Sequence, residues 1–152
     1  KNIFALGDVT NRKNLTPVAI REAVYLVNYL TTKKKQTLNY DKIASGIFTQ
    51  PEVGHIGLGE NDLQKRSINY KILQTEFKPL KYAFSNKNNP VFIKVLYQPK
   101  TEKIFGIIYI GESAAEIIQS LAISFAKTFT LNDLRNTVPV HPTSSEELVT
   151  LV

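Results

Sequence analysis

A β-hairpin is the sequence feature that most restricts the fold of this 152-residue chain. Two apolar runs, Val91–Gln98 and Ile104–Ile110, lie on either side of the turn-forming residues Pro99-Lys-Thr-Glu102. Strand-forming residues joined by a short turn predict two antiparallel strands. Three further strand candidates precede the hairpin along the chain, at Ser45–Gln50, His55–Leu58 and Tyr70–Phe77. The sequence therefore predicts a mainly antiparallel sheet.

Helical segments alternate with these strands. The strongest is Ser113–Lys127, in which Ser113 and Glu116 fit a capping box. Six apolar residues recur there at helical spacing and are expected to pack into the core: Ala114, Ile117, Ile118, Leu121, Ala122 and Phe125. Two shorter helices are predicted at Glu60–Arg66 and Thr130–Arg135. The fold class expected for this part of the chain is α+β, with a sheet flanked by helices.

The amino-terminal part has a different pattern. Apolar residues run from Asn2 into Gly7-Asp8, which predicts a buried strand that ends in a carboxylate. A helix follows, with Thr16 as its N-cap and Pro17 at its first position. Nucleotide-type ligands bind at such strand ends in open α/β sheets, although a Gly-Asp pair is also common in simple turns. The polar and basic stretch 31–41 is the best candidate for a linker.

The segment from His141 to Glu147, called here the histidine segment, reads His-Pro-Thr-Ser-Ser-Glu-Glu. We expect Pro142 to favour an extended His141, and one of the three hydroxyl residues that follow to cap a turn beginning at Glu146. Such a turn brings a carboxylate towards the imidazole, which is the usual arrangement for a histidine that moves protons. A solvated tail with an incidental histidine is the alternative. The only other imidazole, His55, is expected to be structural, and two histidines without cysteine predict no metal site.

Together these segments resemble the carboxyl-terminal part of the flavin-dependent pyridine nucleotide disulfide oxidoreductases, in particular the glutathione reductases. The resemblance covers nearly the whole chain and its elements follow the family order. They are Ile3–Thr10, Leu15–Ile20, Phe48–Gly54, Thr75–Pro79, Gly111, Ala115–Gln119 and His141–Glu147.

This resemblance implies a domain organisation. Residues 1–31 would be the last strand and helix of an FAD-binding domain, residues 32–42 a linker, and residues 43–152 the interface domain of a homodimer. Asp8 would hold a ribityl hydroxyl of FAD, and Gly7 would allow close approach of the backbone. Thr16 would present its backbone to the pyrimidine side of the flavin.

The resemblance also implies roles in catalysis. His141 would reach across the dimer and protonate the departing thiol of a disulfide substrate, with Glu146 as the orienting carboxylate. The main chain at His141 and Pro142 would touch the partner's flavin. Glu147 and Thr150 would lie near the bound disulfide.

Glutathione disulfide is the substrate that the resemblance favours, because Ser144 to Glu147 match the glutathione-using members. Val24 departs from that pattern, since many such members have a basic residue there. Trypanothione-type and lipoamide-type relatives remain alternatives. A dimerising scaffold without catalysis is the alternative of a different class.

Composition limits what these residues do alone. The chain has no cysteine and no G-x-G-x-x-G loop, so it cannot complete a path from NADPH through FAD to a reactive disulfide. We therefore expect a piece of a longer cytoplasmic enzyme, inactive by itself. The net charge of +6 comes from scattered lysines, which argues against nucleic acid as a partner. No apolar run approaches the roughly 18 residues that span a bilayer, so membrane association is not expected.

Overall fold

The computed structural model describes residues 2–86 and 88–152. The chain divides into two compact units, residues 1–40 and residues 41–152, called here unit 1 and unit 2. Among the described residues, none of the helices has both the length and the apolar character that crossing a membrane requires.

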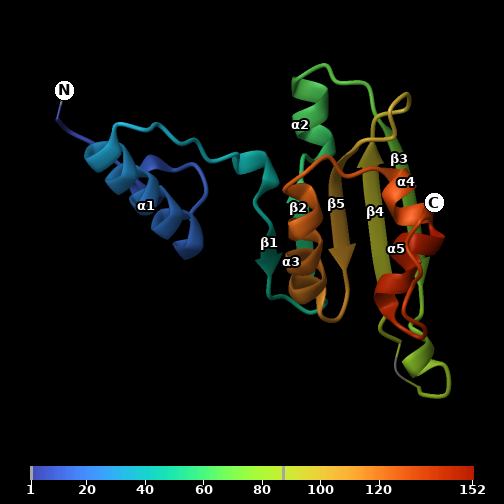
Figure 1. Cartoon of the computed structure of the whole chain (residues 1–152). Helices are drawn as coiled ribbons and strands as arrows, with labels where there is room; N and C mark the ends of the chain where they lie inside the picture. The colour runs from blue at the N-terminus through green and yellow to red at the C-terminus, as the bar shows by residue number, and fades with distance from the viewer. Residues whose placement is uncertain (1, 87) are drawn as a thin grey trace. The chain divides into compact units, whose positions relative to one another are not determined.

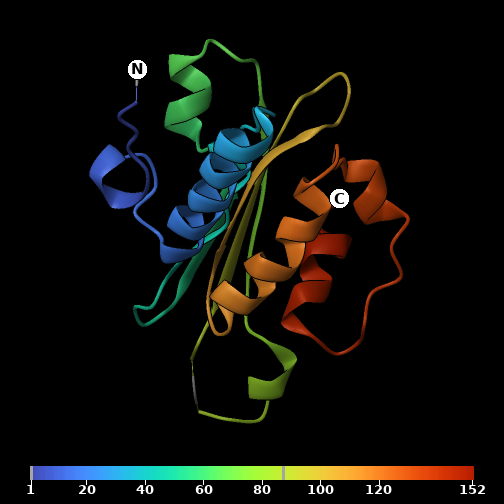
Figure 2. The same cartoon turned by 60° about the vertical axis from the view of Figure 1, so that its left-hand side comes forward.

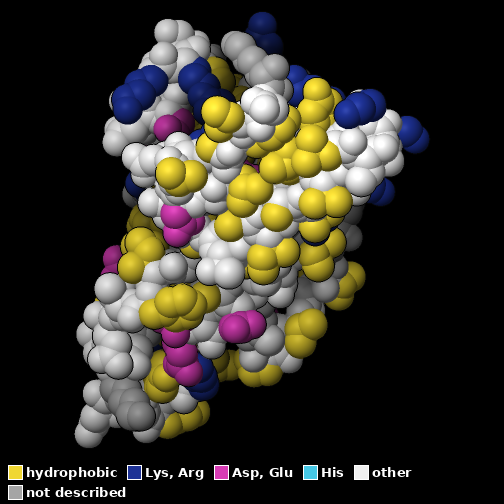
Figure 3. Space-filling view, turned by 90° about the vertical axis from the view of Figure 1, so that its left-hand side faces the viewer, with side chains coloured by type: hydrophobic (Ala, Val, Ile, Leu, Met, Phe, Trp, Pro, Cys, Tyr) yellow, Lys and Arg dark blue, Asp and Glu magenta, His cyan; other side chains and the backbone are white. Residues whose placement is uncertain are grey.

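Unit 1 is built on one long helix, α1 (Thr16–Thr32), as predicted. The helix begins at Thr16, but Leu15 is the N-cap, and Pro17 lies in the first turn, where its missing N–H costs no hydrogen bond. Hydrophobic side chains are frequent on the face drawn in Figure 3. The large hydrophobic residues that α1 exposes are Ile20, Val24, Val27, Tyr29 and Leu30.

The strand predicted before α1 is wrong. Residues 2–6 adopt no regular structure, and Ile3 is 92% exposed. A strand requires a neighbour for its backbone hydrogen bonds, and the described part of unit 1 contains no other strand to supply one. Asp8 consequently lies in the short 3-10 turn Gly7–Thr10, not at the end of a strand.

Unit 2 is an α+β structure around a five-stranded sheet in which every neighbouring pair is antiparallel (Figure 1). The strand order is β1-β2-β5-β4-β3. Its strands are β1 (Ser45–Ile47), β2 (Val53–Gly57), β3 (Lys71–Phe77), β4 (Val91–Tyr97) and β5 (Ile104–Ile110). The predicted hairpin is confirmed as β4 and β5, with Ile93 opposite Tyr109. Strand β1 is shorter than predicted, because the chain turns at Thr49, whose hydroxyl donates to the Pro51 carbonyl at 2.7 Å.

Four helices complete unit 2: α2 (Glu60–Lys65), α3 (Ala114–Phe125), α4 (Leu131–Arg135) and α5 (Glu147–Thr150). In Figure 2, α3, α4 and α5 lie on the same face of the sheet. The core forms there, as the alternating strand pattern requires. It contains Ile56, Val91, Ile93, Val95, Ile104, Ile107, Tyr109, Ala114, Ile118, Phe125, Leu131, Leu134 and Leu148.

The capping box predicted at Ser113 is absent. Ser113 precedes α3 with φ of 61° and makes no side-chain cap hydrogen bond. An N-cap residue normally has an extended backbone, which aims its hydroxyl at the free N–H groups of the first turn. The left-handed conformation of Ser113 prevents this, although α3 still forms through its buried apolar face.

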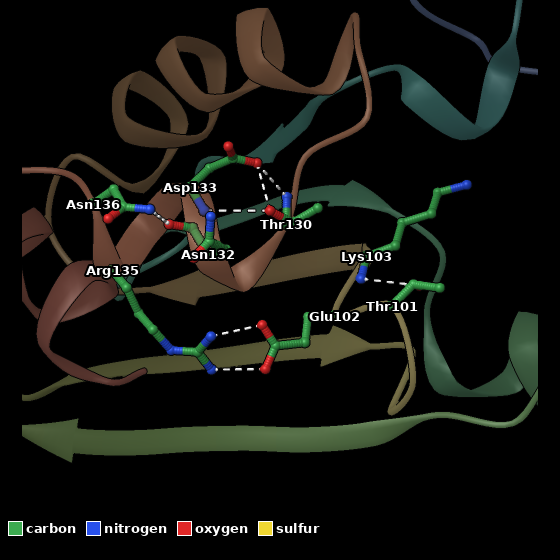
Figure 4. A network of polar contacts seen from close by, with 8 residues as sticks. All are labelled: Thr101, Glu102, Lys103, Thr130, Asn132, Asp133, Arg135 and Asn136. Atoms are coloured by element: carbon green, nitrogen blue, oxygen red, sulfur yellow. Dashed lines mark hydrogen bonds and ion pairs between the residues drawn. The ribbon is translucent and has the colours of Figure 1, made fainter.

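Helix α4 is fastened to the turn of the hairpin (Figure 4). Thr130 and Asp133 form a reciprocal capping box, with the Asp133 N–H donating to Thr130 Oγ1 at 3.2 Å and the Thr130 N–H to Asp133 Oδ2 at 2.8 Å. The Arg135 guanidinium donates two hydrogen bonds to the Glu102 carboxylate, at 2.6 and 2.9 Å. The Leu131 N–H also donates to the Glu102 carbonyl at 3.0 Å. These bonds fix the point from which the chain continues into the histidine segment.

Candidate functional site

The histidine segment folds into a capped turn at the surface of unit 2. Thr143 has an extended backbone, and its hydroxyl accepts the Glu146 N–H at 3.2 Å. A 3-10 turn, Ser144–Glu146, leads directly into α5. Of the three hydroxyl residues that the sequence left open, Thr143 is therefore the cap. Leu148 in α5 is buried in the core and seats the turn on the sheet.

The turn brings His141 and Glu146 together. The His141 Nδ1 atom lies 3.0 Å from Glu146 Oε2 and 3.2 Å from Oε1. The imidazole is 72% exposed, whereas the carboxylate is only 15% exposed. A carboxylate at this distance selects the tautomer with a proton on Nδ1 and leaves Nε2 as the accessible nitrogen. The pair can therefore hold a proton and release it to a group approaching from solvent.

An open groove of about 710 Å³ lies beside this pair. One side consists of the histidine segment, and the other consists of the end of β3 and the residues after it, from Phe77 to Lys81 together with Ala83. No role was predicted for these residues, although Phe77 and Pro79 lie within one of the matching family segments. The groove carries charges of both signs, with Lys78 and Lys81 on one side and carboxylates on the other.

The wall after β3 is fixed to the far end of β5. Lys81 Nζ lies 2.8 Å from Glu112 Oε2, and this carboxylate also accepts the Tyr82 hydroxyl. The hydrogen bond to Glu112 raises the pKa of Lys81 above its ordinary value. Lys78 Nζ donates to the Ser85 carbonyl at 3.2 Å. Both lysines are thus held by the protein at the edge of the groove.

Glu147 and Thr150 occupy neighbouring positions on α5. Glu147 lines the groove, and its carboxylate accepts the Thr150 hydroxyl at 3.0 Å. Thr150 itself is exposed and lies outside the groove lining. The structure therefore places Glu147 in the groove with His141, and Thr150 one helical turn further along α5.

Tyr109 lies beneath the histidine segment. Its side chain on β5 is fully buried. The Tyr109 hydroxyl makes no hydrogen bond of good geometry with the described residues. Burial raises the pKa of Tyr109 to about 12, and the nearby Ser144 hydroxyl offsets part of that rise. The sequence did not single out this group, because nothing in the alternation of β5 distinguishes a buried tyrosine from other apolar residues.

The raised pKa of Tyr109 predicts a loss of stability in alkali. An unfolded tyrosine ionises near pH 10, whereas folded Tyr109 keeps its proton to about pH 12. The contribution of Tyr109 to stability is complete below pH 10 and is lost as the pH rises through 12, with a magnitude of about 3 kcal/mol. We expect Tyr109→Phe to lose less free energy of unfolding than the wild type between about pH 8 and pH 11. Urea denaturation at both pH values tests this, and equal losses in the two proteins would contradict it.

Three of the predicted flavin-site residues, Gly7, Asp8 and Thr16, lie in unit 1, whereas His141 and Pro142 lie in unit 2. Gly7 is buried with φ of 69°, and a Cβ atom there would lie 3.2 Å from the Ala19 side chain. Only glycine adopts this backbone freely, and a side chain there would press against Ala19 of α1. Asp8 follows with an exposed carboxylate, and Thr16 is exposed at the start of α1. The turn therefore places an exposed carboxylate next to a buried glycine that packs against α1.

Comparison with known proteins assigns the chain to a family. Residues 43–152 match the family model described as the dimerisation domain of the pyridine nucleotide-disulphide oxidoreductases. This match covers most of unit 2, the α+β structure with an antiparallel sheet flanked by helices. The chain belongs to the pyridine nucleotide-disulphide oxidoreductase family.

Individual relatives agree with this assignment. The chain is 36% identical over 152 residues to glutathione reductase of Nostoc sp., covering 99% of this chain and 33% of that protein. It is 37% identical over 150 residues to the chloroplastic/mitochondrial glutathione reductase of Pisum sativum, covering 99% of this chain and 27% of the relative. The chain is 35% identical over 152 residues to trypanothione reductase of Leishmania donovani, covering 99% of this chain and 31% of that protein. The chain thus spans about a third of the length of these relatives.

A solved structure shares the fold. The crystal structure of LpdA from Mycobacterium tuberculosis superimposes with a TM-score of 0.79 at 20% identity, covering 98% of this chain and 32% of that one. At this level of identity the likeness shows the fold alone.

Proposed function

We propose that this chain is the carboxyl-terminal part of an FAD-dependent, NADPH-using glutathione-disulfide reductase that acts as a homodimer. The observation that carries the proposal is the hydrogen-bonded pair of His141 and Glu146, which presents an accessible ring nitrogen beside an open groove. The glutathione reductases among the relatives support the same reaction.

His141 acts as the acid of the disulfide step. When a thiolate attacks one sulfur of the substrate disulfide, the S–S bond breaks and the other sulfur leaves as a thiolate. The protonated His141 gives its Nε2 proton to that sulfur and returns to the neutral form with a proton on Nδ1. Glu146, 3.0 Å from Nδ1, stabilises the imidazolium before the transfer and holds the ring in place afterwards. Glu147 and Thr150 contact the substrate beside this step.

The residues of unit 1 fit one end of a flavin site. When bound, FAD would supply the electrons that NADPH delivers to the reactive disulfide. Asp8 would accept a ribityl hydroxyl, and Gly7, whose φ of 69° sets the turn, would bring the backbone close to the cofactor. Thr16 would present the free N–H groups of the α1 start to the pyrimidine side. The main chain at His141 and Pro142 would face the flavin of the partner subunit.

Exposed apolar residues next to the site support the homodimer. Val138 is 89% exposed and Val140 is 73% exposed, and both immediately precede His141. Phe48 and Phe84 of unit 2 are also largely exposed. Large apolar side chains in such positions mark protein interfaces. An interface formed by Val138 and Val140 would carry His141 towards the second subunit.

The choice of substrate rests on charge and on the relatives. A peptide disulfide with both ammonium and carboxylate groups suits a groove that carries lysines and glutamates. Val24 lacks the charge that many glutathione-using relatives have at that position, so trypanothione disulfide remains the second candidate. The Leishmania trypanothione reductase among the relatives favours the same alternative.

The natural full-length polypeptide tests the proposal. We expect it to bind flavin, with the corresponding visible absorbance, and to oxidise NADPH when glutathione disulfide is added. Trypanothione disulfide and lipoamide, offered separately, identify the alternative substrates. The 152-residue chain alone should oxidise no NADPH, since it has no cysteine. A colourless full-length polypeptide that uses none of the three disulfides would instead identify a dimerising scaffold.

A further inference from the structure

Unit 1 contains one acidic side chain on α1, Glu22, and it bonds to the turn before the helix. The Gly7 N–H donates to Glu22 Oε2 at 2.6 Å, across 15 residues of sequence. The other carboxylate oxygen, Oε1, accepts the hydroxyl of Tyr40. Both oxygens are therefore engaged with groups outside the helix.

Tyr40 extends this contact to a third segment. Arg12 Nη1 donates to the Tyr40 hydroxyl oxygen at 3.0 Å, and the Arg12 guanidinium carbon lies 5.7 Å from the centre of the Tyr40 ring. The Tyr40 hydroxyl, followed by the Gly7 N–H, lowers the pKa of Glu22 below its ordinary value. The carboxylate is thus held in its charged form, in which it accepts hydrogen bonds most strongly.

These bonds determine the orientation of the peptide that precedes the Asp8 side chain. Glu22 takes the Gly7 N–H, and the Thr10 hydroxyl donates to the Gly7 carbonyl at 2.8 Å. With both polar groups of Gly7 bonded and its φ at 69°, the plane of the peptide linking Gly7 to Asp8 has little freedom. The direction in which the Asp8 carboxylate leaves the backbone follows from that plane.

We propose that Glu22 is a positioning residue for flavin, holding the Gly7–Asp8 turn in the orientation in which Asp8 meets a ribityl hydroxyl. The inference rests on the proposed function, because it assumes that Asp8 contacts the cofactor. Glu22 itself touches only the protein. Its loss removes the acceptor of a buried glycine N–H and frees the turn to rotate.

Titration of FAD into the flavin-free full-length polypeptide tests this role. We expect Glu22→Ala to raise the Kd for FAD about tenfold, which corresponds to about 1.4 kcal/mol. Glu22→Gln keeps an oxygen acceptor for the Gly7 N–H and should restore most of the affinity. Tyr40→Phe removes one hydroxyl and should weaken binding by about threefold, less than half of the Glu22→Ala effect in free energy.

Asn28→Ala is the matched control. Asn28 also lies on α1 and bonds to the following segment, donating to Gln36 Oε1 at 3.0 Å, but it has no contact with the turn. Its Kd for FAD should equal that of the wild type. Equal weakening by Asn28→Ala and Glu22→Ala would mean that loosening of α1 alone matters, and this would overturn the inference.

Asp8→Ala separates this inference from the proposed function. If Asp8→Ala loses flavin while Glu22→Ala, Glu22→Gln and Tyr40→Phe bind FAD like the wild type, the inference about Glu22 is wrong and the flavin site stands. If Asp8→Ala binds FAD like the wild type, the proposed flavin contact is wrong. Loss of flavin in Asp8→Ala and Glu22→Ala, with rescue in Glu22→Gln, supports both.

Discussion

Replacement of His141 by alanine in the full-length polypeptide is expected to slow disulfide reduction by about 10²- to 10⁴-fold, the usual contribution of a general acid. Flavin reduction by NADPH should stay near the wild-type rate, because the imidazole acts only when the substrate thiolate leaves. Stopped-flow measurements of flavin absorbance, first with NADPH alone and then with glutathione disulfide, resolve the two steps.

The second imidazole of the chain supplies the control. His55 lies on β2 within the sheet, away from the histidine segment in sequence, so His55→Ala should leave the ratio of the two rates unchanged. Glu146→Gln keeps the shape of the side chain but removes its charge from beside Nδ1, and should reduce only the disulfide step, by less than His141→Ala. Equal slowing of both steps in His141→Ala would show that the residue does not serve as the acid.

A substitution at Gly54 is expected to lower the stability of unit 2 strongly. Gly54 lies on β2 directly under α3, where a Cβ atom would come within 2.5 Å of both the Ala114 carbonyl oxygen and Ile118 Cγ1. The carbonyl belongs to the helix backbone and cannot rotate aside, so the whole helix must shift. Gly54→Val should lower the free energy of unfolding by about 3 kcal/mol, at the upper end of the cost of overpacking. Urea denaturation measures this change.

Gly59 is the matched glycine in the same unit. A Cβ atom there would meet only Asp62 Oδ2, at 3.6 Å, which is ordinary contact. Gly59 has φ of −83°, so alanine adopts the same backbone without strain, and Gly59→Ala should cost at most about 1 kcal/mol. Comparable losses at both positions would contradict the close approach of α3 to β2.

Much of unit 2 was predictable because its signals are local. The hairpin β4–β5 was found from two apolar runs and the turn between them, and β5 (Ile104–Ile110) has the predicted bounds. Residues 2–6 carry an equally apolar run but form no strand, since a strand depends on a neighbour that a local pattern cannot reveal. Ser113 failed as a cap for a related reason, because the turn after β5 sets its backbone.

The candidate site also has one part that local sequence predicts and another that depends on contacts between distant segments. The contact between His141 and Glu146 was predictable, because both residues belong to one capped turn. The opposite groove wall, Phe77–Lys81, comes from a distant part of the chain, and only the packed sheet brings it near the histidine segment. The bond from Glu22 to Gly7 joins a side chain to a backbone N–H across 15 residues, which no spacing rule indicates.

The capped turn at Thr143 brings His141 and Glu146 together through local bonds alone. The distance between His141 and Glu146 is set by bonds among close neighbours in sequence, while Leu148 alone from α5 enters the core. A change elsewhere in the sheet therefore alters how firmly this turn is held against the core. It does not alter the distance between the imidazole and the carboxylate. The opposite wall of the groove can therefore change during evolution, and with it the molecules that fit there, without a change in the pairing of His141 with Glu146.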